Sequence, residues 1–174
     1  MVRGRPNPLF TGLPFRLRKA RRQSGLKRLP LGEKAGLATA TGRDIETARS
    51  LPTVGTVARL ASALGVSAGW LGYGLGEQHT DVSAASTDGM GARLASVRIE
   101  CGLTKAALAR LVNLSPSSFA KIENGGQTGV DVLESLAKAL GVSPAWLAFA
   151  EGPREIPKKR RVRAASVQAA DAGR

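Results

Sequence analysis

The side chains of this chain that could do chemistry are mostly cationic. Its 174 residues include 26 Lys and Arg but only 13 Asp and Glu, which gives a formal net charge of +13. There is one histidine and one cysteine, and we find neither a glycine-rich phosphate loop nor clustered carboxylates. The sequence therefore predicts no enzyme, no metal site and no cofactor. An excess of Lys and Arg favours polyanions through counterion release, so nucleic acid is the predicted partner.

The positive charge is unevenly distributed. Residues 16–73 hold eleven basic and three acidic side chains, whereas residues 89–152 hold six and five. The stretch from 153 to 174 adds a net charge of +5. No apolar run approaches the roughly 18 residues needed to cross a membrane, so we expect a soluble, cytoplasmic protein without membrane contact.

The chain contains nearly the same twelve residues twice, as ALGVSAGWLGYG and as ALGVSPAWLAFA. Glu46 aligns with Glu123 at an offset of 77, whereas Trp70 aligns with Trp146 at an offset of 76. The first copy therefore has one extra residue between Glu46 and Leu60, in an expected loop that contains Pro52. The pattern indicates an internal duplication.

Helix start and stop signals follow one another at short intervals in the second copy. Gly102 is typical of the end of a first helix, Thr104 can cap a second, and Ser115 can cap a third. Thr128, three residues before Asp131, resembles a capping box for a fourth helix, and a short fifth helix carries the tryptophan. The sequence thus predicts an all-α fold with five short helices in each copy.

Two helices joined by a tight turn, the second short and polar on its outer face, form a helix-turn-helix. The stretch GLTKAALARLVNLSPSSFAKIENG, followed by LAKALGVSPAWL, resembles the DNA-binding domain of the phage repressor and Cro (XRE-type) family across residues 90–150. The resemblance implies two tandem five-helix, repressor-like domains, the first degenerate, in a nucleoid-associated protein of a bacterium or phage.

The resemblance also implies roles for residues of the second copy. Its third helix would lie in the major groove, with Ser117, Ser118 and Lys121 facing the bases. A lysine can donate to guanine O6 or N7, whereas a serine discriminates weakly. Lys105 and Asn124 match family positions that hold phosphates and so position the domain rather than specify sequence.

An ion pair of the family that ties the first helix to the third has matches in both copies. Arg98 and Glu123 match it in the second copy, and Arg21 and Glu46 match it in the first. We expect these four residues to orient the site without touching bases. Arg28 matches the phosphate-holding lysine of the second copy.

The first copy departs from the family pattern in its third helix. Gly42 falls where Phe119 would fill the core, so we expect weaker packing there. Asp44 would repel nearby phosphates unless it pairs with a cation or accepts a hydrogen bond from a cytosine. The base-facing candidates of this helix are Thr39, Thr41 and Arg43.

Composition predicts the domain boundaries. We expect an irregular N-terminal arm over 1–14, a degenerate helix-turn-helix domain over 15–74, a flexible linker over 75–88, a second helix-turn-helix domain over 89–152, and a basic disordered tail over 153–174. Leu9 and Phe10 of the arm are expected to contact the first domain. Fully extended, the sixteen residues from Gly74 to Gly89 could reach about 50 Å, more than the roughly 34 Å between half-sites one DNA turn apart. The two units could therefore act as an intramolecular pseudo-dimer, and a homodimer is an open alternative.

These observations favour a sequence-specific transcription regulator, most simply a repressor, that binds double-stranded DNA. Two other functions stay open. The near-neutral second copy and the glycine-weakened first copy leave room for an antitoxin-like adaptor that binds a protein partner. The basic first helix and tail leave room for non-specific, nucleoid-associated DNA binding. Salt dependence and the ratio of specific to non-specific affinity separate the three.

Overall fold

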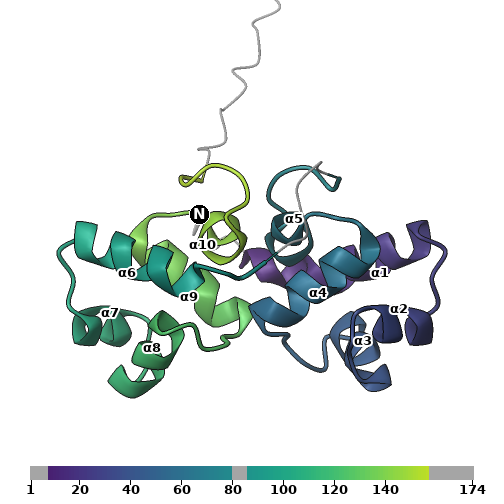
Figure 1. Cartoon of the computed structure of the whole chain (residues 1–174), viewed down its shortest axis with the longest axis horizontal. Coiled ribbons are helices and arrows are strands. Elements are labelled where there is room, and N and C mark those ends of the chain that lie inside the picture. Colours follow the sequence, from purple (N-terminus) through teal and green to yellow (C-terminus); the bar gives the residue numbers. More distant parts are fainter. Residues whose placement is uncertain (1–7, 80–85, 157–174) are drawn as a thin grey trace, which may run out of the picture.

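The computed structural model describes residues 8–79 and 86–156, and all regular elements within them are helical (Figure 1). A short 3-10 helix, η1 (Leu9–Gly12), precedes two units of five α-helices each. The first unit contains α1 (Leu13–Gln23), α2 (Arg28–Lys34), α3 (Thr39–Glu46), α4 (Val54–Leu64) and α5 (Ala68–Tyr73). The second contains α6 (Met90–Glu100), α7 (Lys105–Leu111), α8 (Pro116–Glu123), α9 (Val130–Leu140) and α10 (Pro144–Phe149).

The helix boundaries confirm the all-α fold of two tandem five-helix units. Each helix from α1 to α3 begins and ends 77 residues before its counterpart, and α4 and α5 do so 76 residues before theirs. The extra residue of the first copy therefore lies between Glu46 and Val54, in the loop that contains Pro52. Residues at these offsets are called equivalent below.

Side-chain caps explain where several helices of the second unit begin. Thr104 Oγ1 accepts a hydrogen bond from Ala107 N, and Ser115 Oγ accepts one from Ser118 N. The equivalent residues of the first unit, Lys27 and Ala38, provide no side-chain cap. A missing cap costs about 1 kcal/mol, so the sequence specifies α2 and α3 less strongly than α7 and α8.

The predicted capping box before α9 is wrong. The helix begins at Val130 after Gly129, and no side chain caps it. Thr128 is buried instead, and its carbonyl oxygen accepts a hydrogen bond from Val54 N of the other unit at 2.9 Å. The N-cap position falls on Gly129, which has no side chain, whereas its equivalent Thr53 caps α4.

The core of the second unit includes a large side chain that the first unit lacks. Phe119 of α8 is fully buried, whereas the equivalent residue is Gly42, as the sequence predicted. A Cβ atom built on Gly42 would meet no heavy atom within 4 Å outside its own helix backbone. The core beside α3 is therefore less completely filled than the core beside α8.

The two units pack against each other through α5 and α10, at the centre of Figure 1. Equivalent residues meet there: the rings of Tyr73 and Phe149 lie 6.4 Å apart. A Cβ atom on Gly69 would come 2.7 Å from the Cβ of Ala145, its equivalent. Contact between equivalent residues is the property of an interface with twofold symmetry. The two units of one chain are thus arranged like the subunits of a dimer.

Backbone hydrogen bonds across the interface are reciprocal. Val54 N donates to Thr128 O at 2.9 Å, and the equivalent Val130 N donates to Pro52 O at 3.2 Å. Between them lies an isolated antiparallel bridge that joins Thr53 to its equivalent Gly129. These bonds fix the starts of α4 and α9 relative to each other.

The N-terminal arm is more regular than predicted. Residues 9–12 form η1, and α1 already begins at Leu13. The arm also joins both units instead of the first alone. Leu9 N and Phe10 N donate to the Glu134 carboxylate of α9 at 2.7 and 3.0 Å, while Leu9 O accepts from Arg16 of α1.

Parts of the predicted linker and tail fold back onto the units. Ser67 N donates to Gln78 O, and the equivalent Ser143 N donates to Arg154 O. Arg154 also lies 5.4 Å above the Trp146 ring, so the start of the predicted disordered tail is held against the second unit. The remaining parts of the predicted arm, linker and tail, residues 1–7, 80–85 and 157–174, lie outside the described residues. None of the described helices has the length and apolar character that crossing a bilayer requires.

Candidate nucleic-acid interface

Each unit contains two short helices joined by a tight turn, α2 with α3 and α7 with α8. The turns adopt the left-handed conformation at equivalent positions, with φ of 62° at Gly36 and 57° at Asn113. Glycine and asparagine are the residues that adopt this conformation most readily. Both turns therefore redirect the chain in the same way, and α3 and α8 lie along the same edge of the molecule, the lower edge in Figure 1. We call α3 and α8 the reading helices, after the role that the family resemblance predicts for them.

A buried glutamate at the end of α8 connects three helices of the second unit. Arg98 Nε of α6 lies 2.7 Å from Glu123 Oε1, and Lys105 Nζ of α7 lies 2.8 Å from Glu123 Oε2. Arg98 also donates to Leu103 O at 2.8 Å. The network therefore holds α8 against α6 and α7 by charge-assisted hydrogen bonds.

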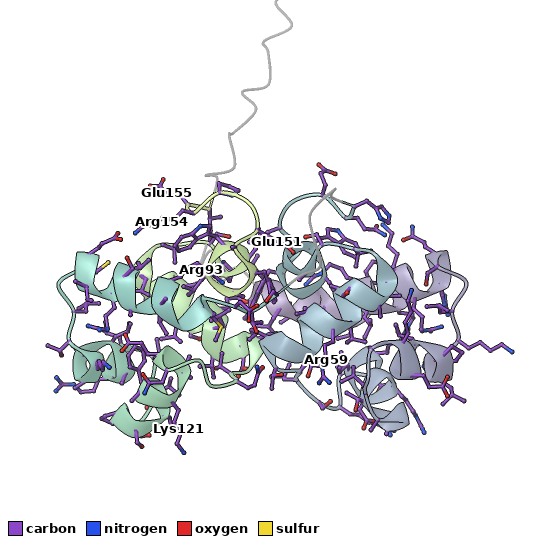
Figure 2. The ribbon with its side chains drawn as sticks, viewed as in Figure 1. Arg59, Arg93, Lys121, Glu151, Arg154 and Glu155 are labelled. Carbon is purple, nitrogen blue, oxygen red and sulfur yellow. The ribbon has the colours of Figure 1, made fainter. Side chains whose placement is uncertain are left out.

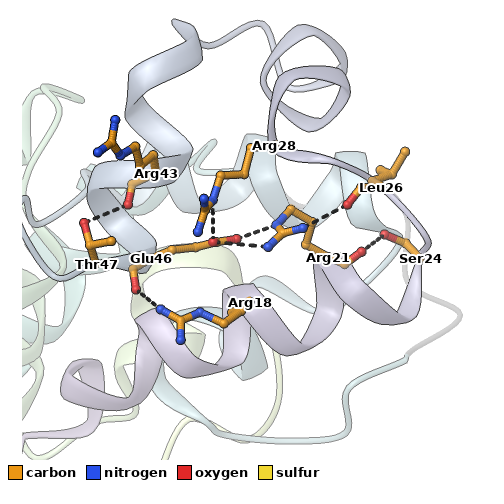
Figure 3. A network of polar contacts seen from close by, with 8 residues as sticks. All are labelled: Arg18, Arg21, Ser24, Leu26, Arg28, Arg43, Glu46 and Thr47. Carbon is orange, nitrogen blue, oxygen red and sulfur yellow. Dashed lines mark hydrogen bonds and ion pairs between the residues drawn. The ribbon is translucent and has the colours of Figure 1, made fainter.

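The first unit repeats this network (Figure 3). Arg21 Nε lies 2.5 Å from Glu46 Oε1, and Arg28 Nε lies 2.9 Å from Glu46 Oε2. Arg18 adds a bond to the carbonyl oxygen of Glu46 at 2.9 Å. The end of α3 is thus held by the same kind of ion network as the end of α8, although α3 has no equivalent of the buried Phe119.

Opposing effects set the pKa of these two glutamates. Burial raises the pKa of Glu123, but hydrogen bonds from Arg98 and Lys105 and their positive charges outweigh burial and keep the pKa below its usual range. The pKa of Glu46 is likewise below its usual range, because hydrogen bonds from its two arginines outweigh burial. Both carboxylates are therefore charged at neutral pH, and each faces two cations.

The base-facing candidates of the second unit lie together on α8. Ser117, Ser118 and Lys121 are all exposed, and Lys121 lies at the lower edge of the molecule (Figure 2). The hydroxyl groups of Ser117 and Ser118 lie 3.1 and 2.8 Å from Ser115 Oγ. These two serines thus have partners in the cap of the helix, whereas Lys121 extends outward. Asn124, expected to hold phosphate, is exposed directly after the helix.

The candidates of the first unit are less uniform. Arg43 is exposed on α3, and Thr41 is half-buried. The side chain of Thr39 lies outside the described part of the structure. Thr47, equivalent to Asn124, directs its hydroxyl back to Arg43 O at 2.9 Å. Asn124 is expected to hold phosphate through its amide, but the equivalent Thr47 of the first unit has no amide group.

The two expected phosphate-holding cations, Lys105 and Arg28, already have carboxylate partners. Each keeps about half of its side chain exposed, 51% for Lys105 and 45% for Arg28. Sequence reasoning assigned the ion pairs to Arg98 and Arg21 alone and missed this second cation. The sequence had shown that Lys105 and Arg28 are equivalent, but not that each faces the buried glutamate of its own unit, Glu123 and Glu46.

Sequence reasoning also missed a repeated arginine that holds the fifth helix. Arg16 Nε donates to Leu71 O at 2.9 Å, and the equivalent Arg93 Nε donates to Leu147 O at 3.0 Å. Burial lowers the pKa of Arg16 to about 10, although the charge of Glu134 opposes this shift. The offset of 77 between the arginines would have identified the pair.

Glu151 is one of the side chains that join the units without an equivalent in the other copy. Glu151 lies at their junction (Figure 2) and accepts hydrogen bonds from Ser67 Oγ, Ala68 N and Gly69 N at 2.5, 3.1 and 2.8 Å. The residue equivalent to Glu151 is Leu75, so the sequence repeat could not predict this contact.

Exposed cations are more numerous on the first unit. Between residues 13 and 73 they are Lys19, Arg22, Lys27, Arg28, Lys34, Arg43, Arg49 and Arg59. Between residues 90 and 149 they are Lys105, Arg110, Lys121 and Lys138. The first unit therefore attracts a polyanion more strongly.

A helical unit with this turn, this buried ion network and a short exposed second helix defines a helix-turn-helix domain. Two family models match the sequence: one described as "Helix-turn-helix" matches residues 17–71, and one described as "Helix-turn-helix domain" matches residues 90–166. The chain belongs to the XRE-like helix-turn-helix family and carries two such domains in tandem. It is therefore a DNA-binding regulator.

Proposed function

We propose that the protein is a sequence-specific repressor that occupies a two-part operator as a single chain. The observation that carries this proposal is the pseudo-twofold interface between α5 and α10, together with the position of both reading helices on one edge. A repressor dimer presents two reading helices to successive major grooves in this manner. Here one chain supplies both halves.

In this proposal α8 reads one half-site and α3 reads the other. Lys121 donates to a guanine, with Ser117 and Ser118 adding weaker contacts. Arg43 is the main donor of α3, and Thr39 and Thr41 are the other base-facing candidates of this helix. Lys121 and Arg43 are exposed. Their exposure supports this assignment, because a side chain must extend from the protein surface to contact a base edge.

Phosphate contacts position the two units. Lys105, Asn124 and Arg28 lie beside the reading helices, and the half-exposed cations can share their charge between glutamate and phosphate. The surplus of exposed cations on the first unit supports a larger electrostatic contribution from that unit. Occupation of a promoter by the complex would exclude polymerase from the same DNA, in the cytoplasm of a bacterium or of a phage-infected cell.

Selection of binding sites from random duplex DNA at about 150 mM salt tests the proposal. The wild type is compared with a Ser117→Ala, Lys121→Ala double variant and a Thr41→Ala, Arg43→Ala double variant. Lys138→Ala removes an exposed cation of α9 and is the matched control. We expect a two-part site from the wild type and the control, with each double variant losing information in a different half.

Other outcomes would contradict the proposal in recognisable ways. A steep salt dependence without any enriched sequence indicates non-specific, nucleoid-associated binding. Weak binding to all DNA at this salt indicates an adaptor that recognises a protein instead. Loss of information only in the α8 variant would show that the first unit holds DNA without reading it.

A further inference from the structure

The reading helices present four equivalent positions outward. In a helix, residues i, i+3, i+4 and i+7 share one face. On and directly after α3 these positions hold Ala40, Arg43, Asp44 and Thr47. On and directly after α8 they hold Ser117, Ala120, Lys121 and Asn124. All four pairs differ in residue type, although each pair is 77 residues apart.

The scaffold behind these positions is the same in both units. The buried glutamates Glu46 and Glu123 and their arginine partners occupy equivalent positions and make equivalent bonds. The reading helices are therefore held in similar poses, and their outward faces differ by chemistry rather than by orientation. Substitutions on the outward face alone would change which bases a helix prefers, but they would not change the orientation of the helix.

The largest difference is a reversal of charge between Asp44 and Lys121. Lys121 is exposed and Asp44 is half-buried, with Arg43 next to it on the same face. No ion pair among residues 8–79 and 86–156 uses the Asp44 carboxylate. A carboxylate repels phosphates, but it can accept a hydrogen bond from cytosine N4 in the major groove, where a lysine donates to guanine O6 or N7.

We propose that the operator consists of two unequal half-sites that differ at this matching position. In the half-site of α8, Lys121 contacts a guanine. In the half-site of α3, the equivalent residue Asp44 contacts a cytosine at the equivalent base position. This inference rests on the proposed function, because it requires both reading helices to enter major grooves. It makes the protein a reader of a non-palindromic site, which a symmetric homodimer could not prefer.

The proposal predicts the order of affinity for three designed duplexes. The mixed site, with guanine in one half and cytosine in the other, binds most tightly. Either palindrome leaves one side chain facing the wrong base. A good base contact discriminates by a free energy that corresponds to a factor of about 5 to 150, so we expect a loss on the order of 10-fold.

The test is binding-site selection with the wild type and two variants of one residue. Asp44→Lys should change the first half-site from cytosine to guanine at this position and leave the second half-site unchanged. Asp44→Asn keeps the side-chain shape and should shift the preference to adenine, which presents matching donor and acceptor groups. Glu33→Lys makes the same charge change at an exposed residue of α2 and should raise affinity without changing the selected bases.

The results separate failure of this inference from failure of the proposed function. A palindromic site from the wild type, or a site that neither Asp44 variant changes, overturns the inference while sequence-specific binding stands. Absence of any enriched site from the wild type overturns the proposed function itself. A wild-type site with unequal halves, changed by both Asp44 variants and not by Glu33→Lys, supports the inference.

Discussion

Removal of the Glu151 carboxylate would weaken the junction of the two units. Its two oxygens accept three hydrogen bonds from the first unit, at 2.5 Å from Ser67 Oγ, 3.1 Å from Ala68 N and 2.8 Å from Gly69 N. The donors lie at the start of α5, where a negative charge is also favoured by the helix dipole. Glu151→Ala removes all three bonds and this charge.

The expected cost is about 2 kcal/mol in the free energy of unfolding. One hydrogen bond to a charged group contributes about 1.5–3 kcal/mol. The sum of three would overestimate the effect, because Glu151 is half-buried and water can replace part of what the variant loses. For a chain of this length, about 2 kcal/mol corresponds to a decrease in Tm of about 4–8 °C.

Urea unfolding followed by tryptophan fluorescence measures this change, since each unit holds one of the two tryptophans. Glu155→Ala is the matched control, because this exposed glutamate lies four residues further along the same segment. We expect little change in the control. A loss below about 0.5 kcal/mol in Glu151→Ala, equal to that of an ordinary surface substitution, would refute the reasoning.

Three further predictions concern the units themselves. Gly42→Ala should stabilise the protein by about 0.5–1 kcal/mol in urea unfolding, because the space is open and alanine restricts the unfolded chain; destabilisation would contradict an open site. The folded-state pKa of Glu123 is below its unfolded value, so the stability it contributes is complete above about pH 4.3 and is lost as pH falls through the folded pKa. Stability should therefore fall less steeply in acid for Glu123→Gln than for the wild type, and equal slopes would contradict the network. Burial raises the pKa of Tyr73, the only tyrosine, so tyrosinate absorbance should appear only above about pH 10 and together with unfolding; simple titration near pH 10 in the folded protein would contradict its burial.

The helical frame could be predicted from the sequence because its signals are local. Gly102 and Ser115 indicate helix ends through their own backbone and side-chain chemistry, and the loop that holds the extra residue follows from two offsets. The family resemblance then placed Arg98 beside Glu123 and Arg21 beside Glu46. The same ion pair occurs in both copies, so its assignment in one copy supported its assignment in the other.

Contacts between the units could not be predicted, because they depend on how two folded surfaces meet. Thr128 has the pattern of a helix cap, yet its carbonyl bonds across the interface. Glu134 holds the backbone of η1 from the other unit, and Glu151 has no equivalent acid in the first copy. Comparison of the two copies reveals only the residues that they share. The interface between the units also uses residues that occur in one copy only.

The most direct test of the account is the number of chains bound to one operator. The mass of the complex between the full chain and its selected duplex can be measured by light scattering, with footprinting of the DNA backbone on the same complex. The account predicts one chain per duplex, with protection of two successive major grooves on one face of the DNA. Two chains on the same two-part site, each protecting one groove, would contradict a single-chain repressor.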